Sequence, residues 1–207
     1  LDEIVDAADY VFKKEGASII GGHTSKGGEL TIGFTIIGQI NKKPITLNGA
    51  KDGDQIILTK PLGTGTILAG EMQGLAKGIW IKNAHDWMMK SQGCVTKFLV
   101  NKVTSMTDVT GFGLVRHVEN IVRDLVITFN MKIGAEISLN KIPLIKGASH
   151  ILENTAIRAS LHQSNKRSFV NFNGLNKLSK PVSDILFDPQ TSGGIVAVIP
   201  TAKATKI

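Results

Sequence analysis

Strand-like and helix-like patterns alternate along most of this sequence, and this alternation constrains the fold more than any other feature. Short apolar or β-branched runs predict strands, whereas apolar residues spaced three and four apart predict amphipathic helices. Strand-like runs lie at 17–20, 30–40, 55–60 and 127–139, with a strand end and turn at 105–113 and a glycine-rich loop and terminal strand within 183–200. Helical patterns lie at 1–16, 66–78, 80–103 with a break near Gln92 and Gly93, 114–125 and 144–161. Because turns link several of the strands, we expect an α/β (α+β) fold with a mixed or antiparallel sheet packed with helices.

A change in composition divides the chain. The stretch from Asn41 to Asp54 is rich in turn-forming residues and separates a short first part from a longer second part. We therefore predict two domains, 1–45 and 46–207. The sequence begins at Leu1 inside a helical pattern and stops at Ile207 just after a strand-like run, so we expect a piece of a longer protein.

The charge and composition limit the classes of function. The 207 residues include 24 Lys and Arg against 17 Asp and Glu, a formal net charge of +7. The basic residues are mostly Lys and are scattered, so we expect no direct nucleic-acid partner, although an excess of Lys suits an enzyme that handles polyphosphates. No apolar run approaches the ~20 residues of a membrane span. Cys94 is the only cysteine, which fits a cytoplasmic protein, and its helical spacing favours a half-buried structural thiol over a nucleophile.

Glycine-bearing loops recur beside the predicted strands and helices. They lie at 21–29, 59–66, 107–113 and 188–194, and each also holds Thr or Ser. Glycine lets the backbone approach a ligand and point its N–H groups at phosphate oxygens, and a helix N-terminus favours the same anions. Any one of these loops is also explained by a simple turn. Together they favour a phosphate-binding function.

Asp108 is the acid with the most informative position, at a strand end directly before a small-residue bend. A carboxylate there can reach Mg²⁺, which takes one or two protein carboxylates beside phosphates and water. It can equally cap the helix that follows. The residues alone leave both interpretations open, with Glu29 and Asp188 as the few further carboxylates near such loops.

Other polar residues have weaker signals. We expect a structural role for His23 and a packing or capping role for His117, and no histidine pair has zinc spacing. Lys60, Lys166 and Arg167 are candidate anion contacts that solvation explains equally well.

Several motifs together resemble those of the selenophosphate synthetases (selenide, water dikinases), within the aminoimidazole-ribonucleotide synthetase superfamily. They are "GGHTS", "LTKPLGTGT", "MTDVTGFGLVRH", "SLHQSNKRSF" and "LFDPQTSGG", in that order and across essentially the whole chain. The resemblance implies the end of an ATP-binding N-terminal domain followed by the C-terminal α/β domain. Arg116 departs from the family, which usually has glycine there, and this puts the close packing of that helix in doubt.

The resemblance also implies an activity and its site. Such enzymes convert ATP, selenide and water into selenophosphate, AMP and phosphate, for selenocysteine and selenouridine synthesis, and they are homodimers. Asp108 matches the family's Mg²⁺ ligand. Gly21, Gly22, His23 and Thr24 match a loop that contacts ATP bound by the partner subunit. The family's catalytic Cys or selenocysteine and its catalytic Lys fall upstream of Leu1, so we expect no catalytic residue, and no activity, in this chain alone.

The same residues are compatible with three alternatives. The chain can belong to another ATP-dependent enzyme of the same superfamily, which would release ADP, or to a non-catalytic dimerising paralogue. An RNA-binding module is a third and weaker interpretation.

Overall fold

The computed structural model describes residues 1–41, 43–169 and 178–204, and these divide into two compact units, Leu1–Pro44 and Ile45–Ile207. The first unit holds one helix, α1 (Asp2–Lys14), as predicted. Its remaining described residues contain no strand, so the strands expected at 17–20 and 30–40 are wrong. A strand requires a hydrogen-bonded neighbour, and the described part of this unit offers none. Phe12 and Phe34 nevertheless pack edge to face, with ring centroids 5.3 Å apart.

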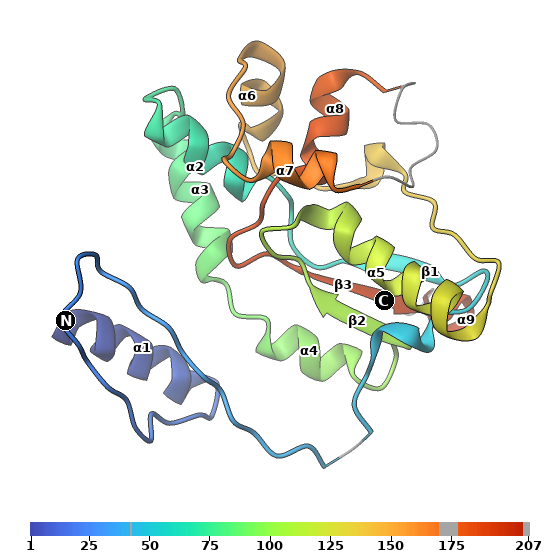
Figure 1. Cartoon of the computed structure of the whole chain (residues 1–207), viewed down its shortest axis with the longest axis horizontal. Coiled ribbons are helices and arrows are strands. Elements are labelled where there is room, and N and C mark those ends of the chain that lie inside the picture. The colour runs from blue at the N-terminus through green and yellow to red at the C-terminus, as the bar shows by residue number, and fades with distance from the viewer. Residues whose placement is uncertain (42, 170–177, 205–207) are drawn as a thin grey trace. The chain divides into compact units, whose positions relative to one another are not determined.

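A three-stranded antiparallel sheet organises the second unit, with β3 between β1 and β2 (Figure 1). The strands are β1 (Gln55–Leu58), β2 (Ser105–Asp108) and β3 (Ile195–Ile199). In register, Leu58 lies opposite Val196 and Asp108 lies opposite Ile195. The end of β1, the end of β2 and the start of β3 therefore meet at one edge of the sheet.

Helices cover the sheet and extend beyond it. The first four helices of this unit are α2 (Thr64–Met72), α3 (Gly78–Met89), α4 (Gly93–Leu99) and α5 (Gly113–Phe129). They are followed by α6 (Ala148–Asn154), α7 (His162–Arg167), α8 (Lys180–Asp184) and α9 (Thr201–Ala204). Short 3₁₀ turns form η1 (Leu47–Gly49), η2 (Leu139–Lys141) and η4 (Ile185–Phe187). The predicted α/β architecture with a helix-packed sheet is confirmed.

The core explains why β3 is a continuous apolar run. All five of its residues are buried, because alternate side chains enter separate clusters on the two faces of the sheet. Val196 and Val198 pack with α5 and η4, whereas Ile195, Ala197 and Ile199 pack with Leu99 of α4. A third cluster joins α2, α3 and α6 around Ile67 and Trp80. Figure 1 shows α5 lying across the sheet.

Three local predictions are wrong. The segment 127–139 is no strand, since α5 continues to Phe129 and ends at Asn130 in the left-handed conformation (φ 52°), a common helix C-cap. Within 144–161 only α6 is helical, and the following residues 155–159 have no regular structure. Cys94 is exposed rather than half-buried, because Leu99 is the residue by which α4 reaches the core.

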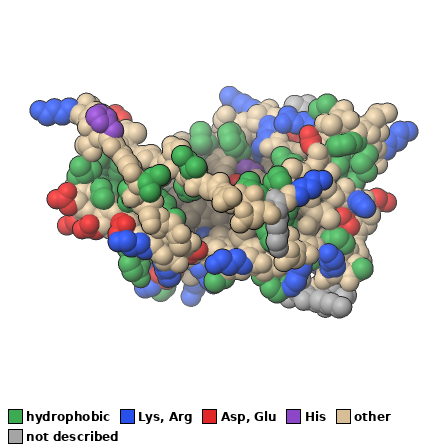
Figure 2. Space-filling model, turned by 90° about the horizontal axis from the view of Figure 1, so that it is seen from below, with side chains coloured by type: hydrophobic (Ala, Val, Ile, Leu, Met, Phe, Trp, Pro, Cys, Tyr) green, Lys and Arg blue, Asp and Glu red, His purple; other side chains and the backbone are tan. Residues whose placement is uncertain are grey.

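The surface shows no dominant charged region in the view of Figure 2, where Lys and Arg side chains are spread among acidic and apolar ones. Among the described residues, none of the helices combines the length and the apolar character needed to cross a membrane.

Candidate functional site

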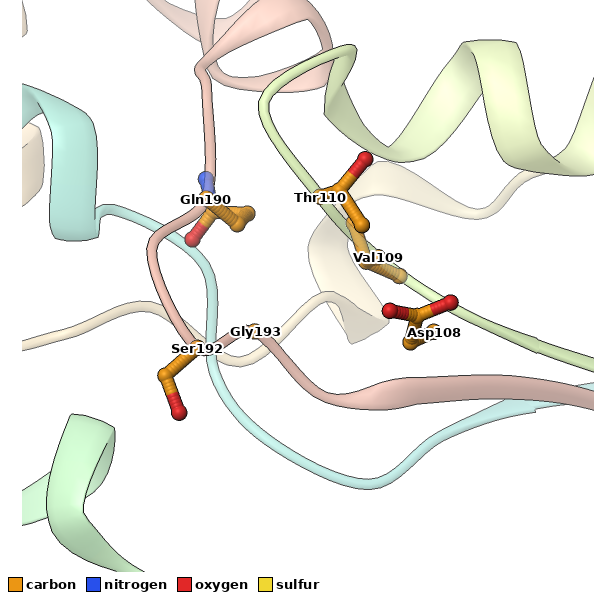
Figure 3. Close-up of a pocket in the computed structure, with 6 residues that line it drawn as sticks. All are labelled: Asp108, Val109, Thr110, Gln190, Ser192 and Gly193. Atoms are coloured by element: carbon orange, nitrogen blue, oxygen red, sulfur yellow. The ribbon is translucent and has the colours of Figure 1, made fainter. Parts of the chain in front are cut away.

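A pocket of about 270 Å³ opens at the edge of the sheet where the strand ends meet. Figure 3 shows its two sides: Asp108, Val109 and Thr110 on the segment that leaves β2, and Gln190, Ser192 and Gly193 on the segment that enters β3. Two backbone hydrogen bonds hold the segments together, from Val109 N–H to the Gly194 carbonyl at 2.8 Å and from Gln190 N–H to the Thr110 carbonyl at 3.1 Å. The antiparallel pairing of β2 with β3 thus brings two of the predicted glycine loops into one site.

The glycine loop that follows β1 joins the same site through Gln190, which is 4% exposed. The Gln190 Oε1 atom accepts hydrogen bonds from the N–H groups of Gly63 (3.1 Å) and Thr64 (3.3 Å). Its Nε2 atom donates to the carbonyl and to the Oδ2 atom of Asp188, both at 2.8 Å. We call this group of residues (63, 64, 188 and 190) the Gln190 clasp. It fixes the N-terminus of α2 to the loop that lines the pocket.

Asp188 serves the clasp rather than the solvent-facing pocket. Its side chain is almost fully buried, and Thr66 Oγ1 donates to its Oδ1 atom at 2.8 Å. Burial raises the pKa of Asp188 to about 6, although the hydrogen bonds from Thr66 and Gln190 oppose that rise. Since both carboxylate oxygens already have partners inside the fold, this carboxylate is committed to structure.

Asp108 is exposed at the end of β2 and faces the pocket. It is not the cap of the following helix, because α5 begins at Gly113 with Phe112 at the N-cap position. The capping interpretation is therefore wrong. The only side-chain donor that the structure gives Asp108 among the described residues is Thr107 Oγ1, at the long distance of 3.4 Å. Its oxygens are consequently available to a ligand.

His117 supports the turn that carries Asp108. It is buried, and its Nε2 atom accepts a hydrogen bond of 3.0 Å from the backbone N–H of Thr110. Accepting that bond requires a neutral ring, and burial lowers the His117 pKa, with the Asp108 charge acting in the opposite direction. The predicted packing or capping role of His117 is confirmed.

Arg116, where the family usually has glycine, is not among the residues that line the pocket. Its guanidinium pairs with Glu119 and donates to the Ser168 carbonyl (2.6 Å) and hydroxyl (2.9 Å). Close packing in this helix occurs at Gly113 instead, where an added Cβ would lie 2.9 Å from the Leu186 carbonyl oxygen. Arginine at 116 therefore leaves the tight contact of α5 intact.

The other predicted residues fall into two groups. Gly21, Gly22, His23 and Thr24 are exposed in the first unit, which the structure describes by itself. Lys166 is drawn into an ion pair with Asp184 (2.9 Å) and Arg167 is exposed, whereas Lys60 is buried beside the pocket.

Gln190, the residue that links the loops, was missed from the sequence. The loop 188–194 was singled out for its glycines, but a glutamine has no periodicity or spacing signal of its own. Gln190 accepts hydrogen bonds from the backbone N–H groups of residues 63 and 64. This contact becomes visible only once β1 and β2 are seen to pair with β3.

Comparison with known proteins places the chain in a family. Residues 51–206 match the C-terminal domain of AIR synthase related proteins. The chain belongs to this family. It is 30% identical over 99% of its length to selenide, water dikinase 2 of Peptoclostridium acidaminophilum, and 33% identical over 95% to the selenide, water dikinase of Bdellovibrio bacteriovorus. It spans 57% and 55% of those relatives, a little over half of their length.

A solved structure is more distantly similar. The thiamine monophosphate kinase of Aquifex aeolicus matches 76% of this chain and 45% of its own, with a TM-score of 0.47 and 15% identity.

Proposed function

We propose that this chain forms the C-terminal part of a selenide, water dikinase, which makes selenophosphate from ATP, selenide and water and releases AMP and phosphate. The observation that supports this most is the pocket at the sheet edge, where an exposed Asp108 faces a glycine-rich loop. The similarity to two selenide, water dikinases over nearly the whole chain supports ATP and selenide as the proposed substrates.

Mg²⁺ is the metal that this donor set fits. Asp108 supplies one accessible carboxylate, and no group of three or more His, Cys, Asp or Glu gathers among the residues that the structure describes. Such a site suits an ion that takes one or two carboxylates and completes its shell with phosphate oxygens and water. Bound there, Mg²⁺ would neutralise charge on the phosphates of ATP.

The residues of this chain act by positioning. Asp108 would hold the metal, and His117 keeps the turn after β2 in place through Thr110. The Gln190 clasp fixes the opposite wall, so that the loop at 191–193 is preorganised for a phosphate. Phosphoryl transfer depends chiefly on such placement and charge stabilisation rather than on covalent chemistry.

The remaining expectations belong to the same proposal. Residues 1–45 form the end of the N-terminal domain and 46–207 the C-terminal domain. Gly21, Gly22, His23 and Thr24 contact ATP bound mainly by the partner subunit of a homodimer, and the enzyme acts in the cytoplasm. The catalytic Cys or selenocysteine and Lys are contributed by sequence outside this chain.

Product analysis tests the proposal. The full-length protein is incubated anaerobically with ATP, Mg²⁺ and selenide, and the phosphorus products are followed by ³¹P NMR and nucleotide chromatography. We expect AMP, phosphate and a selenophosphate resonance that requires selenide. ADP as the nucleotide product would assign another ATP-dependent activity of the superfamily, and the absence of selenide-dependent turnover would contradict the proposal.

A further inference from the structure

Lys60 is a buried cation beside the pocket. It follows β1 and its side chain is 4% exposed, which is rare for lysine. Its ammonium donates one hydrogen bond, of 3.0 Å, to the backbone carbonyl of Ser192. Ser192 lines the pocket, so the ammonium lies directly behind the pocket wall.

This ammonium lacks a counter-charge. The ion pairs found among the described residues do not include Lys60, and a single neutral carbonyl satisfies only one of its three donors. Burial lowers the Lys60 pKa, and the positive charge of Lys90 lowers it further. Burying a charge without an opposite charge is unfavourable, so an unpaired buried ammonium suggests that a ligand supplies the negative charge.

The backbone next to Lys60 is also prepared for an anion. Ser192 adopts the left-handed conformation (φ 48°), which is uncommon for a residue other than glycine. In the described part of the chain, the N–H groups of Ser192 and Gly193 have no hydrogen-bond acceptor. The loop packs tightly against the Lys60 backbone, since a Cβ added at Gly194 would lie only 2.6 Å from the Lys60 backbone nitrogen.

We propose that Lys60, together with the N–H groups of Ser192 and Gly193, binds a phosphate group in the Asp108 pocket. The phosphate would supply the negative charge that Lys60 lacks inside the protein. This inference rests on the proposed function only in that the pocket handles phosphates. Lys60 lies behind the wall formed by Ser192, and Asp108 lies on the other wall. A phosphate in the pocket would therefore be held between Mg²⁺ on Asp108 and the Lys60 ammonium.

The test combines affinity with stability in Lys60→Met, which keeps the length of the apolar stem and removes the charge. Binding of inorganic pyrophosphate, with Mg²⁺ present, is measured by isothermal titration calorimetry, and the thermal midpoint is measured without pyrophosphate. Lys82→Met is the matched control, because Lys82 is exposed and paired with Asp86 on α3. A parallel titration with orthophosphate separates a free phosphate from the chain of phosphates in a nucleotide.

We expect Lys60→Met to weaken pyrophosphate binding at least tenfold while its thermal midpoint stays unchanged or rises, and Lys82→Met to bind normally. Unchanged binding by Lys60→Met, or no binding by the unmodified chain, would overturn the inference. A fall in binding together with a lower midpoint would overturn it too, since Lys60 would then be a structural support of Ser192. None of these results depends on selenide, so the proposed reaction is judged separately by its products.

Discussion

Replacing Gln190 with methionine should loosen the wall of the pocket more than any change at its rim. The glutamine is buried and uses both ends of its amide, accepting from two backbone N–H groups and donating twice to Asp188. Methionine fills a similar volume but makes none of these bonds. Gly63 N–H, Thr64 N–H and the Asp188 Oδ2 atom would then lose their partner inside the protein.

The magnitude follows from the cost of unpaired buried groups, roughly 1–3 kcal/mol each. Thr64 Oγ1, which donates to Gln190 Oε1 at 3.1 Å, can turn toward water, and water entering from the pocket recovers part of the rest. We therefore expect Gln190→Met to lower the free energy of unfolding by about 3 kcal/mol. Since domains are typically stable by about 5–15 kcal/mol, the variant should still fold.

The loss should also depend on pH. The pKa of Asp188 in the folded protein, about 6, lies above its ordinary value of 3.8, so the stability linked to this group is complete below pH 3.8 and is lost as the pH rises through 6. Gln190 donates to the ionised form and limits that loss. The difference between the unmodified chain and Gln190→Met should accordingly widen between pH 4 and pH 7.

Urea unfolding followed by circular dichroism at both pH values measures this difference. Gln163→Met is the control, since Gln163 is exposed on α7 and should change stability by less than about 0.5 kcal/mol. The proposed role of the Gln190 clasp would be refuted if Gln190→Met were as stable as the control. It would also be refuted if the difference in unfolding free energy between the unmodified chain and Gln190→Met narrowed as the pH rises.

Three further outcomes follow from the same structure. Gly113→Ala should lower the thermal midpoint by several degrees, because φ is +79° and the new Cβ would meet backbone atoms 2.9–3.0 Å away, whereas Gly111→Ala, whose Cβ meets only a leucine methyl at 3.5 Å, should not. Asp184→Asn should cost about 3 kcal/mol in urea unfolding, since two buried or half-buried basic side chains lose their counter-charge; the exposed Asp86→Asn should cost less than about 1 kcal/mol. The pKa of Asp184 is lowered by those cations against the opposing effect of burial, so its contribution is present above pH 3.8 and falls away below it; an equal loss at all pH values would contradict this.

The second unit was largely predictable because its patterns are local and strong. The apolar run at 195–199 and the amphipathic spacing of 114–125 each have one structural solution, and the break near Gln92 and Gly93 separates α3 from α4 as expected. The segment 30–40 failed because alternation indicates a strand only where another strand pairs with it. The run 127–139 failed because its first residues continue a helix whose end is set by Asn130.

The site was predictable in its loops but not in its connections. The glycines, together with Asp108, marked the loops 59–66, 107–113 and 188–194. They could do so because a glycine indicates a conformationally free backbone from its own identity, without knowledge of distant residues. The sheet order β1-β3-β2, which brings those loops together, is a property of long-range pairing. Burial of Lys60 and the role of Gln190 depend on that order, and so neither has a signal in the sequence.

Asp108→Asn in the full-length protein tests the central claim most directly. Asp108 is exposed and, among the described residues, accepts only one long hydrogen bond from a side chain, so the substitution should leave the fold and its thermal midpoint unchanged. If Asp108 holds Mg²⁺ against the phosphates of ATP, Mg²⁺-dependent ATP turnover should fall by about two orders of magnitude or more, where each 1.4 kcal/mol of lost stabilisation is tenfold in rate. Turnover close to that of the unmodified enzyme, in a variant with normal stability, would contradict the assignment of this pocket.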